Sequence, residues 1–244
     1  MARQRLDQAL EARGLLPSRS RARDAILRGT VAVNGITAQK PHQPVDPDDT
    51  ITLADPAAAY VSRAALKLVA GLEAGGIDPS GRICLDLGSS TGGFTQVLLN
   101  QGATRVYAVD VGHEQLHESL KSDARVISLE GVNGRDLTEA IIPEPLEGLV
   151  SDVSFVSLTK VLDAPLALCA HKAWSVLLFK PQFEVGREHV GRGGIVSDEA
   201  AIDRALAALI AFMIERGWTH KASVPSPIAG GDGNRETVVV FTRQ

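Results

Sequence analysis

The stretch RICLDLGSSTGGFT, from Arg82 to Thr95, decides the fold. The apolar run ICLDL is typical of a buried strand, and it ends in a glycine-rich segment from which a helical pattern begins. Glycines at the carboxyl end of a central strand allow a tight turn and let a ligand approach the backbone. The spacing differs from G-x-G-x-x-G, and the lysine of a phosphate-binding loop is absent. We therefore expect a strand, a turn and a helix, either with a ligand at the turn or as an ordinary connection.

Further strand-like segments alternate with helical patterns along the chain. They are RVYAVDVG, ARVISLE, GLVSDVSF, WSVLLFK, HKASVPS and TVVVFT, which begin at Arg105, Ala124, Gly148, Trp174, His220 and Thr237. This alternation predicts an α/β fold with a parallel sheet and helices on both faces. A helix within residues 61–76 precedes the first strand and is expected to bury Ala65, Leu68, Val69 and Leu72.

The longest apolar run, ALAALIAFMI over Ala205–Ile214, has ten residues, whereas a membrane-spanning helix needs about 20. We expect a core helix there, with Ser197 or Asp198 as its N-cap. The N-terminal residues are charged and lack the apolar core of a signal peptide. The cysteines, Cys84 and Cys169, show no metal-ligand spacing. These features predict a cytoplasmic protein without a disulfide, a metal site or a membrane partner.

Positive charge is concentrated in the first 45 residues, which carry eight Arg or Lys and three Asp or Glu, whereas residues 46–244 carry 17 and 26. A basic segment on an acidic body indicates a polyanionic partner. Two short helical patterns are followed by an Asn34-Gly35 hairpin signal and a last strand at Ile51–Leu53. We expect a small α+β domain over residues 1–54, a linker over 55–63 and the α/β domain over 64–244.

Six arginines of the first segment suit contacts with phosphates, which position a nucleic acid without reading its sequence. They are Arg3, Arg5, Arg19, Arg21, Arg23 and Arg28. A solvated helix face is the alternative for any one of them. The segment has no aromatic residue on which a base would stack, so a folded RNA surface is expected rather than a free strand.

Three charged residues stand at the ends of predicted strands. Asp110 ends the strand after the glycine loop, where an acid accepts hydrogen bonds from ribose hydroxyls, so loop and acid together indicate a nucleoside-bearing cofactor. Asp152 and Lys180 lie at the ends of the fourth and fifth predicted strands, which would make them neighbours at one sheet edge. The alternatives are a helix N-cap for Asp152 and a surface lysine for Lys180. From pattern alone, Lys67 and Glu236 are expected in solvent.

These residues resemble a known family. Asp86-x-Gly88-x-x-x-Gly92-Gly93 followed by Asp110 is similar to S-adenosylmethionine-dependent methyltransferases. In order and setting, Lys67, Asp152, Lys180 and Glu236 resemble the Lys-Asp-Lys-Glu tetrad of FtsJ-like RNA ribose methyltransferases. The strings YVSRAALKL, DLGSSTGGFT, SDVSFVSL, LLFKPQFEVGRE and SPIAGGDGN resemble the TlyA family, also called hemolysin A. The first segment is similar to the RNA-binding domain named after ribosomal protein S-four.

The resemblance implies a Rossmann-like methyltransferase that moves a methyl group from S-adenosylmethionine to a cytidine 2'-hydroxyl of ribosomal RNA. The large ribosomal subunit is expected as substrate, with the small one left open. The implied catalytic residues are Lys67, Asp152, Lys180 and Glu236. The implied cofactor residues are Asp86, Gly88, Ser90, Gly92, Gly93, Phe94, Asp110, Asn133 and Asp152.

Two protonation roles for Lys180 stay open at this point, a neutral general base and a charged stabiliser, because Lys67 favours the neutral form and Asp152 the charged form. Two other functions also stay open. A cytolysin would need a membrane-active segment, for which ALAALIAFMI is short. A non-catalytic RNA-binding protein with a retained methyltransferase fold would not need the tetrad.

Overall fold

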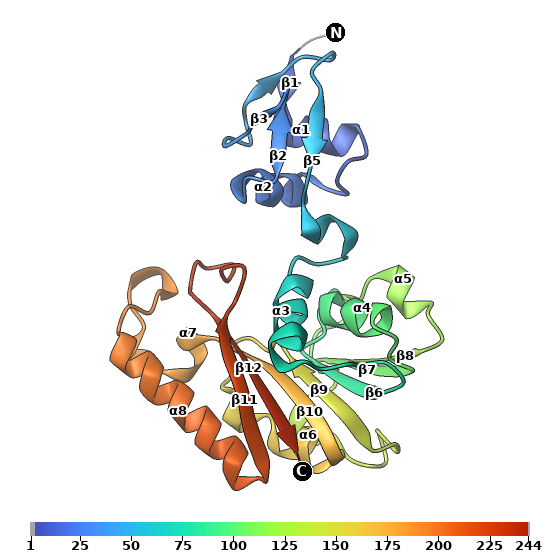
Figure 1. Ribbon diagram of the computed structural model, residues 1–244, viewed down its shortest axis with the longest axis vertical. Coiled ribbons are helices and arrows are strands. Elements are labelled where there is room, and N and C mark those ends of the chain that lie inside the picture. Colours follow the sequence, from blue (N-terminus) through green and yellow to red (C-terminus); the bar gives the residue numbers. More distant parts are fainter. Residues whose placement is uncertain (1–2, 244) are drawn as a thin grey trace. The chain divides into compact units, whose positions relative to one another are not determined.

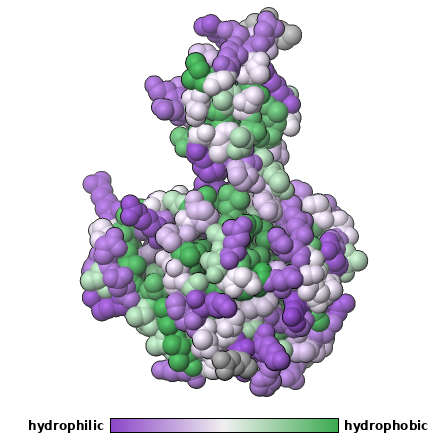
Figure 2. Space-filling model, viewed as in Figure 1, coloured by the Kyte–Doolittle hydropathy of each residue, from purple (hydrophilic) through white to green (hydrophobic). Residues whose placement is uncertain are grey.

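The computed structural model describes residues 3–243 of the chain, which divides into two compact units, Met1–Ala59 and Tyr60–Gln244. Figure 1 traces the elements of both units. The domain limits expected from the sequence, at residues 54 and 64, remain a prediction. Among residues 3–243 we find no helix that combines the length and the apolar character needed to cross a bilayer. In Figure 2, hydrophilic side chains are spread over the visible surface, between pale and hydrophobic ones.

The first unit is a small α+β fold around a core of its own. Its elements are β1 (Gln4–Arg5), α1 (Leu6–Ala12), α2 (Arg19–Leu27), β2 (Val31–Val33), β3 (Ile36–Thr37), β4 (Pro44–Val45), β5 (Ile51–Leu53) and η1 (Pro56–Ala59). The Ser18 side chain caps α2 by accepting from the Arg21 N–H. Asn34 and Gly35 both have positive φ, 50° and 80°, as a two-residue hairpin turn of type I′ requires. The predicted hairpin and the last strand are confirmed.

The second unit is built on one sheet. Its elements are α3 (Ala65–Gly75), β6 (Ile83–Leu87), α4 (Gly93–Asn100), β7 (Arg105–Asp110), α5 (Glu118–Lys121), β8 (Val126–Glu130), η2 (Gly134–Asp136), β9 (Leu146–Ser151), η3 (Leu158–Lys160), α6 (Asp163–Ala167), β10 (Cys169–Phe179), α7 (Pro181–Glu184), η4 (Arg187–His189), η5 (Arg192–Gly194), α8 (Glu199–Glu215), β11 (Trp218–Pro225) and β12 (Thr237–Arg243). The strand order is β11-β12-β10-β9-β6-β7-β8.

The predicted parallel sheet is confirmed for β10, β9, β6, β7 and β8. Strand β12 departs from the prediction, because it runs antiparallel to both of its neighbours, β10 and β11. A reversed strand begins at the edge where the parallel strands end. Residues just before β12 therefore reach the edge at which ligands bind in this class of sheet.

Helices cover both faces of the sheet, as predicted. Alternate residues of each strand point to opposite faces, so Cys84 belongs to the core cluster that includes residues of α3, α4 and α5, whereas Leu85 belongs to the cluster that includes residues of α6 and α8. Helix α8 has Asp198 as its N-cap, as expected. The prediction of a core helix was partly wrong. Helix α8 buries only the face that carries Ala201, Leu209 and Met213, and Ile214 is 55% exposed.

Helix α3 lies close against the sheet. A Cβ added at Gly71 would lie 2.4 Å from Val176 Cγ1 and 2.7 Å from Val238 Cγ1, so a glycine is needed at this contact. Lys67 stands four residues earlier on the same helix face, and it is buried. The predicted buried face was partly wrong: Val69 is half-buried, whereas Lys67 and Gly71 are buried.

Candidate active site

Four charged side chains meet at the carboxyl edge of the parallel strands. Asp152 directly follows β9, and Lys180 directly follows β10. Glu236 directly precedes the reversed strand β12, whose first residue pairs with the last residue of β10. Lys67 reaches the same place from α3. The structure therefore brings together all four residues predicted as catalytic.

The four residues form two linked ion pairs, which we call the tetrad. Lys180 Nζ lies 2.6 Å from Asp152 Oδ1, and Lys67 Nζ lies 2.6 Å from Glu236 Oε2. Lys67 Nζ is also 3.9 Å from Asp152 Oδ2, which joins the pairs. The side chains of Lys67, Lys180 and Glu236 are 8%, 9% and 3% exposed. Lys67 and Glu236 are thus buried, and the expectation from pattern that they lie in solvent was wrong.

Burial shapes the electrostatics of the tetrad. Burial raises the pKa of the Glu236 carboxyl above its usual range, and the Lys67 ammonium opposes that shift. When both lysines are protonated, the two lysines and the two carboxylates balance in formal charge. A group of this kind persists under burial only while each charge keeps its partner, because an unpaired buried charge is costly.

The glycine loop between β6 and α4 is shaped by its backbone. Gly88 has φ +83°, and a Cβ there would lie 3.0 Å from the Val153 backbone nitrogen. Gly92 has φ +93°, and a Cβ there would overlap Leu120. A side chain at either position would both strain the turn and displace a neighbour. Gly92 lines neither of the cavities described below; its lack of a side chain lets the loop pack against Leu120, and its predicted contact with a cofactor stays a prediction.

Asp86 supports the loop from below. It is fully buried, and its Oδ2 accepts hydrogen bonds from the Thr95 N–H and the Thr95 hydroxyl at 2.8 and 2.7 Å. Burial raises the pKa of Asp86 to about 7. Asp86 lines neither cavity. In the structure it fixes the start of α4 against β6, and its predicted contact with a cofactor stays a prediction.

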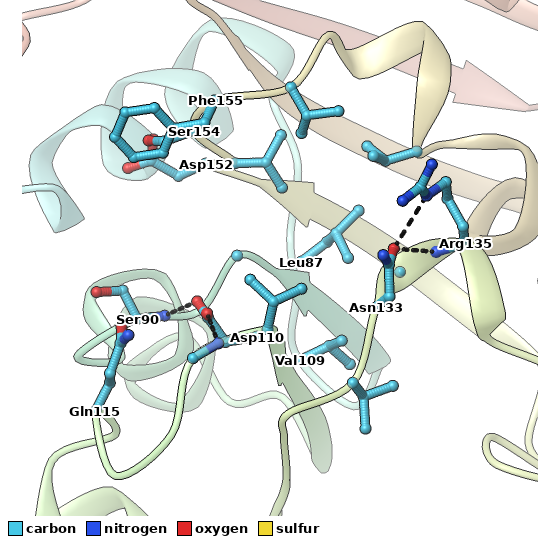
Figure 3. Close-up of a pocket in the computed structure, with 18 residues that line it drawn as sticks. Leu87, Ser90, Val109, Asp110, Gln115, Asn133, Arg135, Asp152, Ser154 and Phe155 are labelled. Carbon is cyan, nitrogen blue, oxygen red and sulfur yellow. Dashed lines mark hydrogen bonds between the residues drawn. The ribbon is translucent and has the colours of Figure 1, made fainter.

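Two neighbouring cavities open at this edge. The first, about 540 Å³, is walled by apolar side chains including Val132, Val153 and Val156, with Asp110 and Asn133 beside them. Figure 3 shows this cavity with Asp110 on one side and Asp152, Ser154 and Phe155 on the other. The second, about 470 Å³, contains the tetrad together with Gly93 and Phe94. The residues that line both cavities are Gly88, Ser90, Asp152, Ser154 and Phe155.

Asp110 is held in place by the backbone and still faces the cavity. Its Oδ2 accepts from the Ser90 N–H and its Oδ1 from the Gly112 N–H, both at 2.8 Å (Figure 3). Each oxygen keeps lone pairs for further donors. Asn133 uses its Oδ1 for the Arg135 N–H at 3.1 Å and its amide nitrogen remains a potential donor. Asp110 and Asn133, both predicted as cofactor residues, therefore line one cavity.

Comparison with known proteins agrees with this geometry. Residues 60–243 match the model of the FtsJ-like methyltransferases, and residues 4–51 match the S4 domain. The chain belongs to the FtsJ-like methyltransferase family. We call Met1–Ala59 the S4 unit and Tyr60–Gln244 the methyltransferase unit.

Individual relatives extend the likeness over both units. The 16S/23S rRNA (cytidine-2'-O)-methyltransferase TlyA of Mycobacterium tuberculosis is 44% identical over 235 residues, which are 96% of this chain and 88% of the relative. A solved structure named as a hemolysin from Streptococcus thermophilus is 36% identical, with a TM-score of 0.77 over 100% of this chain and 90% of the other. Fibrillarin from Aeropyrum pernix, 14% identical with a TM-score of 0.52 over 72% of this chain and 75% of the other, shares the fold.

The structure adds residues that the sequence did not single out. Ser154 Oγ lies 2.8 Å from Lys180 Nζ, and Gln182 lines the tetrad cavity and donates to Asp232 at 2.9 Å. Phe155 is 91% exposed at the junction of the two cavities. The signal for Ser154 was its place two residues beyond Asp152 in the same loop. Within residues 3–243 no three His, Cys, Asp or Glu side chains are grouped as metal ligands would be.

The six arginines of the S4 unit fall into two groups. Arg3, Arg5, Arg19 and Arg23 are exposed at the surface. Arg21 and Arg28 are half-buried: the first donates to the Ala57 carbonyl, and the second pairs with Asp55 at 2.6 Å. Arg3 also pairs with Asp46, and Arg5 and Arg19 with Asp7, but these three guanidinium side chains stay 45–69% exposed. Exposure therefore distinguishes the two groups, and phosphate contact stays a prediction for all six arginines.

We expect Asp86→Asn to change how the stability of the methyltransferase unit depends on pH. The pKa of Asp86 is about 7 in the folded chain, against 3.8 ordinarily, so folding binds this proton. The stabilising contribution is fully present below pH 3.8 and is lost as the pH rises through about 7. Asparagine does not titrate and keeps an acceptor for Thr95. Relative to wild type, the variant should therefore gain roughly 2–4 kcal/mol between pH 4 and pH 8.

Urea unfolding at several pH values measures this gain. Both tryptophans, Trp174 and Trp218, lie in the methyltransferase unit, so their fluorescence reports on that unit. A free-energy difference between variant and wild type that stays constant over this pH range would contradict the raised pKa.

Proposed function

We propose that this chain transfers a methyl group from S-adenosylmethionine to the ribose 2'-hydroxyl of a cytidine in ribosomal RNA. The main support for this proposal is the tetrad, which lies beside the glycine loop where two cavities adjoin. The name of the Mycobacterium tuberculosis relative, 44% identical, supports the cytidine and the ribosomal RNA. A tetrad with every partner in place also argues for an enzyme rather than an RNA-binding protein that has kept only the fold.

The first cavity fits the proposed cofactor. Its apolar walls suit a purine ring, and Asn133 would meet the ring edge. Asp110, fixed by two backbone N–H groups, would accept from the ribose hydroxyls. Gly88 and Ser90 would lie along the amino-acid end, where the first cavity adjoins the second. When bound, S-adenosylmethionine supplies an electrophilic methyl group on a sulfonium.

The tetrad is suited to taking a proton from the attacking hydroxyl. A ribose hydroxyl is a weak nucleophile until its proton is removed, and it must be held in line with the methyl carbon. Lys180 receives the proton as general base. Asp152, 2.6 Å from Lys180 Nζ, stabilises the ammonium that forms. Lys67, fixed by Glu236, lies 3.9 Å from Asp152 Oδ2 and offsets part of the charge of that carboxylate.

The S4 unit is suited to holding the RNA. Arg19 and Arg23 lie exposed on α2, and guanidinium groups pair well with phosphates. Such contacts fix the register of the RNA and leave recognition of the nucleotide to the methyltransferase unit. Ribosomal RNA as substrate agrees with the cytoplasmic location that the sequence predicts.

Gly88→Ala should abolish cofactor binding at the concentrations wild type needs. The added Cβ would meet the Val153 backbone at 3.0 Å, at a φ of +83° that alanine rarely adopts. We expect cofactor affinity to fall by about 30-fold or more, since both strain and displacement act at the cavity wall. Isothermal titration calorimetry measures it.

Gly81→Ala is the matched control for this variant. Gly81 has φ +75°, and a Cβ there would meet no atom within 4 Å. It lies outside both cavities, so the control carries the backbone strain alone. Equal affinities of wild type and the Gly88 variant would contradict the proposed place of the cofactor.

The proposed function is tested with purified ribosomal subunits. Separate large and small subunits that lack the modification are incubated with the protein and methyl-labelled S-adenosylmethionine, and the labelled nucleotide is mapped by mass spectrometry. We expect a 2'-O-methylcytidine in large-subunit RNA, and the small-subunit arm decides whether that RNA is a second substrate. Label on a base, or transfer to neither subunit, would overturn the proposal.

A further inference from the structure

Ser154 is the reachable polar group beside Lys180. It lies in the loop after β9, is exposed and lines both cavities. Its Oγ is 2.8 Å from Lys180 Nζ. In Figure 3 Ser154 stands with Asp152 and Phe155 on the side of the cavity opposite Asp110. A hydroxyl that enters the second cavity therefore meets Ser154 as well as the lysine.

The tetrad itself offers little surface. The side chains of Lys180 and Lys67 are 9% and 8% exposed, and that of Asp152 is 15% exposed. Lys180 Nζ has three oxygens around it: Asp152 Oδ1 at 2.6 Å, Ser154 Oγ at 2.8 Å and the Asp152 carbonyl at 3.2 Å. Of these three oxygens, only that of Ser154 belongs to an exposed residue. Lys180 and Ser154 both line the second cavity, so a hydroxyl that approaches the lysine nitrogen there also comes close to the serine hydroxyl.

The loop that carries Ser154 is anchored at both ends. At its start the Asp152 N–H donates to the Leu87 carbonyl at 3.1 Å. At its end Glu184 accepts from the Leu158 N–H at 2.8 Å and from the Ser157 hydroxyl at 2.7 Å. Glu184 ends α7, the helix that begins beside Lys180. The serine and the lysine are therefore held together from two directions.

The backbone between these anchors is strained. Phe155 has φ +66°, which is rare for an aromatic residue, and its ring lies 5.3 Å from that of Phe183 on α7. Strain of this kind persists where surrounding contacts fix the backbone, and it clusters at functional sites. The conformation that turns Ser154 toward Lys180 is therefore a fixed feature of the site.

We infer that Ser154 is a catalytic residue that relays the proton of the ribose 2'-hydroxyl to Lys180; this rests on the proposed function. A serine hydroxyl has one donor hydrogen and two acceptor lone pairs, so it can donate to the neutral Lys180 amine while accepting from the ribose hydroxyl. The ribose O–H bond breaks and its proton passes to Ser154 Oγ. The original Ser154 proton passes to Lys180 Nζ, which becomes an ammonium.

The electrons balance in the same step. The freed electron pair on the 2'-oxygen forms the bond to the methyl carbon, and the pair of the sulfur–carbon bond returns to sulfur. Ser154 ends as a neutral hydroxyl, and the positive charge moves from sulfur to Lys180. The new ammonium faces the three oxygens already around Nζ, including Asp152 Oδ1 at 2.6 Å. The product state therefore needs no rearrangement of the loop.

The test compares Ser154→Ala, Ser154→Thr and Ser157→Ala in single-turnover methylation of the subunit that wild type modifies. General acid–base groups contribute about 10²- to 10⁴-fold, so Ser154→Ala should be slower by about 100-fold or more. Threonine keeps the hydroxyl, and Ser154→Thr should stay within about tenfold of wild type, the residual loss reflecting its stiffer side chain. Ser157 lies in the same loop, but its hydroxyl donates a hydrogen bond to Glu184. Ser157→Ala therefore controls for disturbance of the loop.

Two further readouts separate a relay from a structural effect. Cofactor affinity by calorimetry should be unchanged in Ser154→Ala. We also measure the single-turnover rate in mixtures of light and heavy water. For wild type, the plot of rate against deuterium fraction should be curved, because two protons move in the same step. A relay predicts the same curvature for Ser154→Thr. A Ser154→Ala rate close to wild type, a straight wild-type plot, or equal losses in Ser154→Ala and Ser157→Ala would overturn the relay. Wild type that methylates no RNA would overturn the proposed function with it.

Discussion

Lys180→Ala should bind S-adenosylmethionine normally and lose methyl transfer. The side chain lies in the tetrad cavity, and its nitrogen is the proton acceptor of the proposed step. Losing a general base and the charge partner of Asp152 together should lower the single-turnover rate by about 10³-fold or more. Calorimetric affinity for the cofactor should change by less than about threefold, because the lysine lines only the second cavity.

Lys172→Ala is the matched control for this loss. Lys172 lies on the same strand, β10, near its other end, and it is exposed. Its removal should leave transfer near the wild-type rate. Turnover of Lys180→Ala close to that of the control would remove Lys180 from the mechanism.

Lys67→Met should destabilise the methyltransferase unit strongly. Methionine retains much of the length and apolar volume of the lysine stem but leaves the Glu236 carboxylate, 3% exposed, without its partner at 2.6 Å. Breaking one side of a buried ion pair costs about 3–5 kcal/mol, because the remaining charge is buried and uncompensated. Urea unfolding followed by tryptophan fluorescence measures the loss, since Trp174 and Trp218 both belong to this unit.

Two companion variants make this prediction specific. Lys67→Met combined with Glu236→Leu removes both charges and should recover most of the lost stability, because no buried charge is then unpaired. Lys172→Met changes an exposed lysine and should stay within about 0.5 kcal/mol of wild type. A single Lys67→Met variant as stable as the Lys172 control would show that Glu236 is stabilised without the lysine.

The sequence predicted half of the tetrad by physical reasoning. Asp152 and Lys180 end neighbouring parallel strands, and the carboxyl ends of such strands share one edge, so their proximity follows from the strand pattern. Glu236 lies at that edge only because β12 is reversed, and strand alternation does not reveal direction. Resemblance to FtsJ-like methyltransferases supplied it instead.

The sequence around Lys67 carries a weak signal of burial. Lys67 stands four residues before Gly71 and eight before Gly75, on the row of α3 that lies closest to the sheet. Small residues on a helix face let the backbone approach its neighbour, and a lysine on that same row is carried inward with it. A lysine aligned with buried glycines is thus a better candidate for a site than its residue type suggests.

Tertiary packing also determines which of the residues predicted to bind a ligand face a cavity or the surface. Asp86 belongs to the glycine motif, yet both neighbouring cavities leave it out because its carboxylate bonds Thr95 beneath the loop. Arg28 belongs to the basic segment, yet it pairs internally with Asp55. Charge and motif position are visible in a sequence, whereas the internal partner that takes a side chain out of a binding surface is set by tertiary packing.

The position of β12 between β10 and β11 determines when the sheet can be completed during synthesis of the chain. Residues 218–225 leave the ribosome before residues 237–243, yet among the described strands β11 pairs only with β12. Until those later residues emerge, β11 has no partner strand and Glu236 has no fixed place beside Lys67. The sheet and the tetrad are thus completed together, once residues 236–243 have been synthesised.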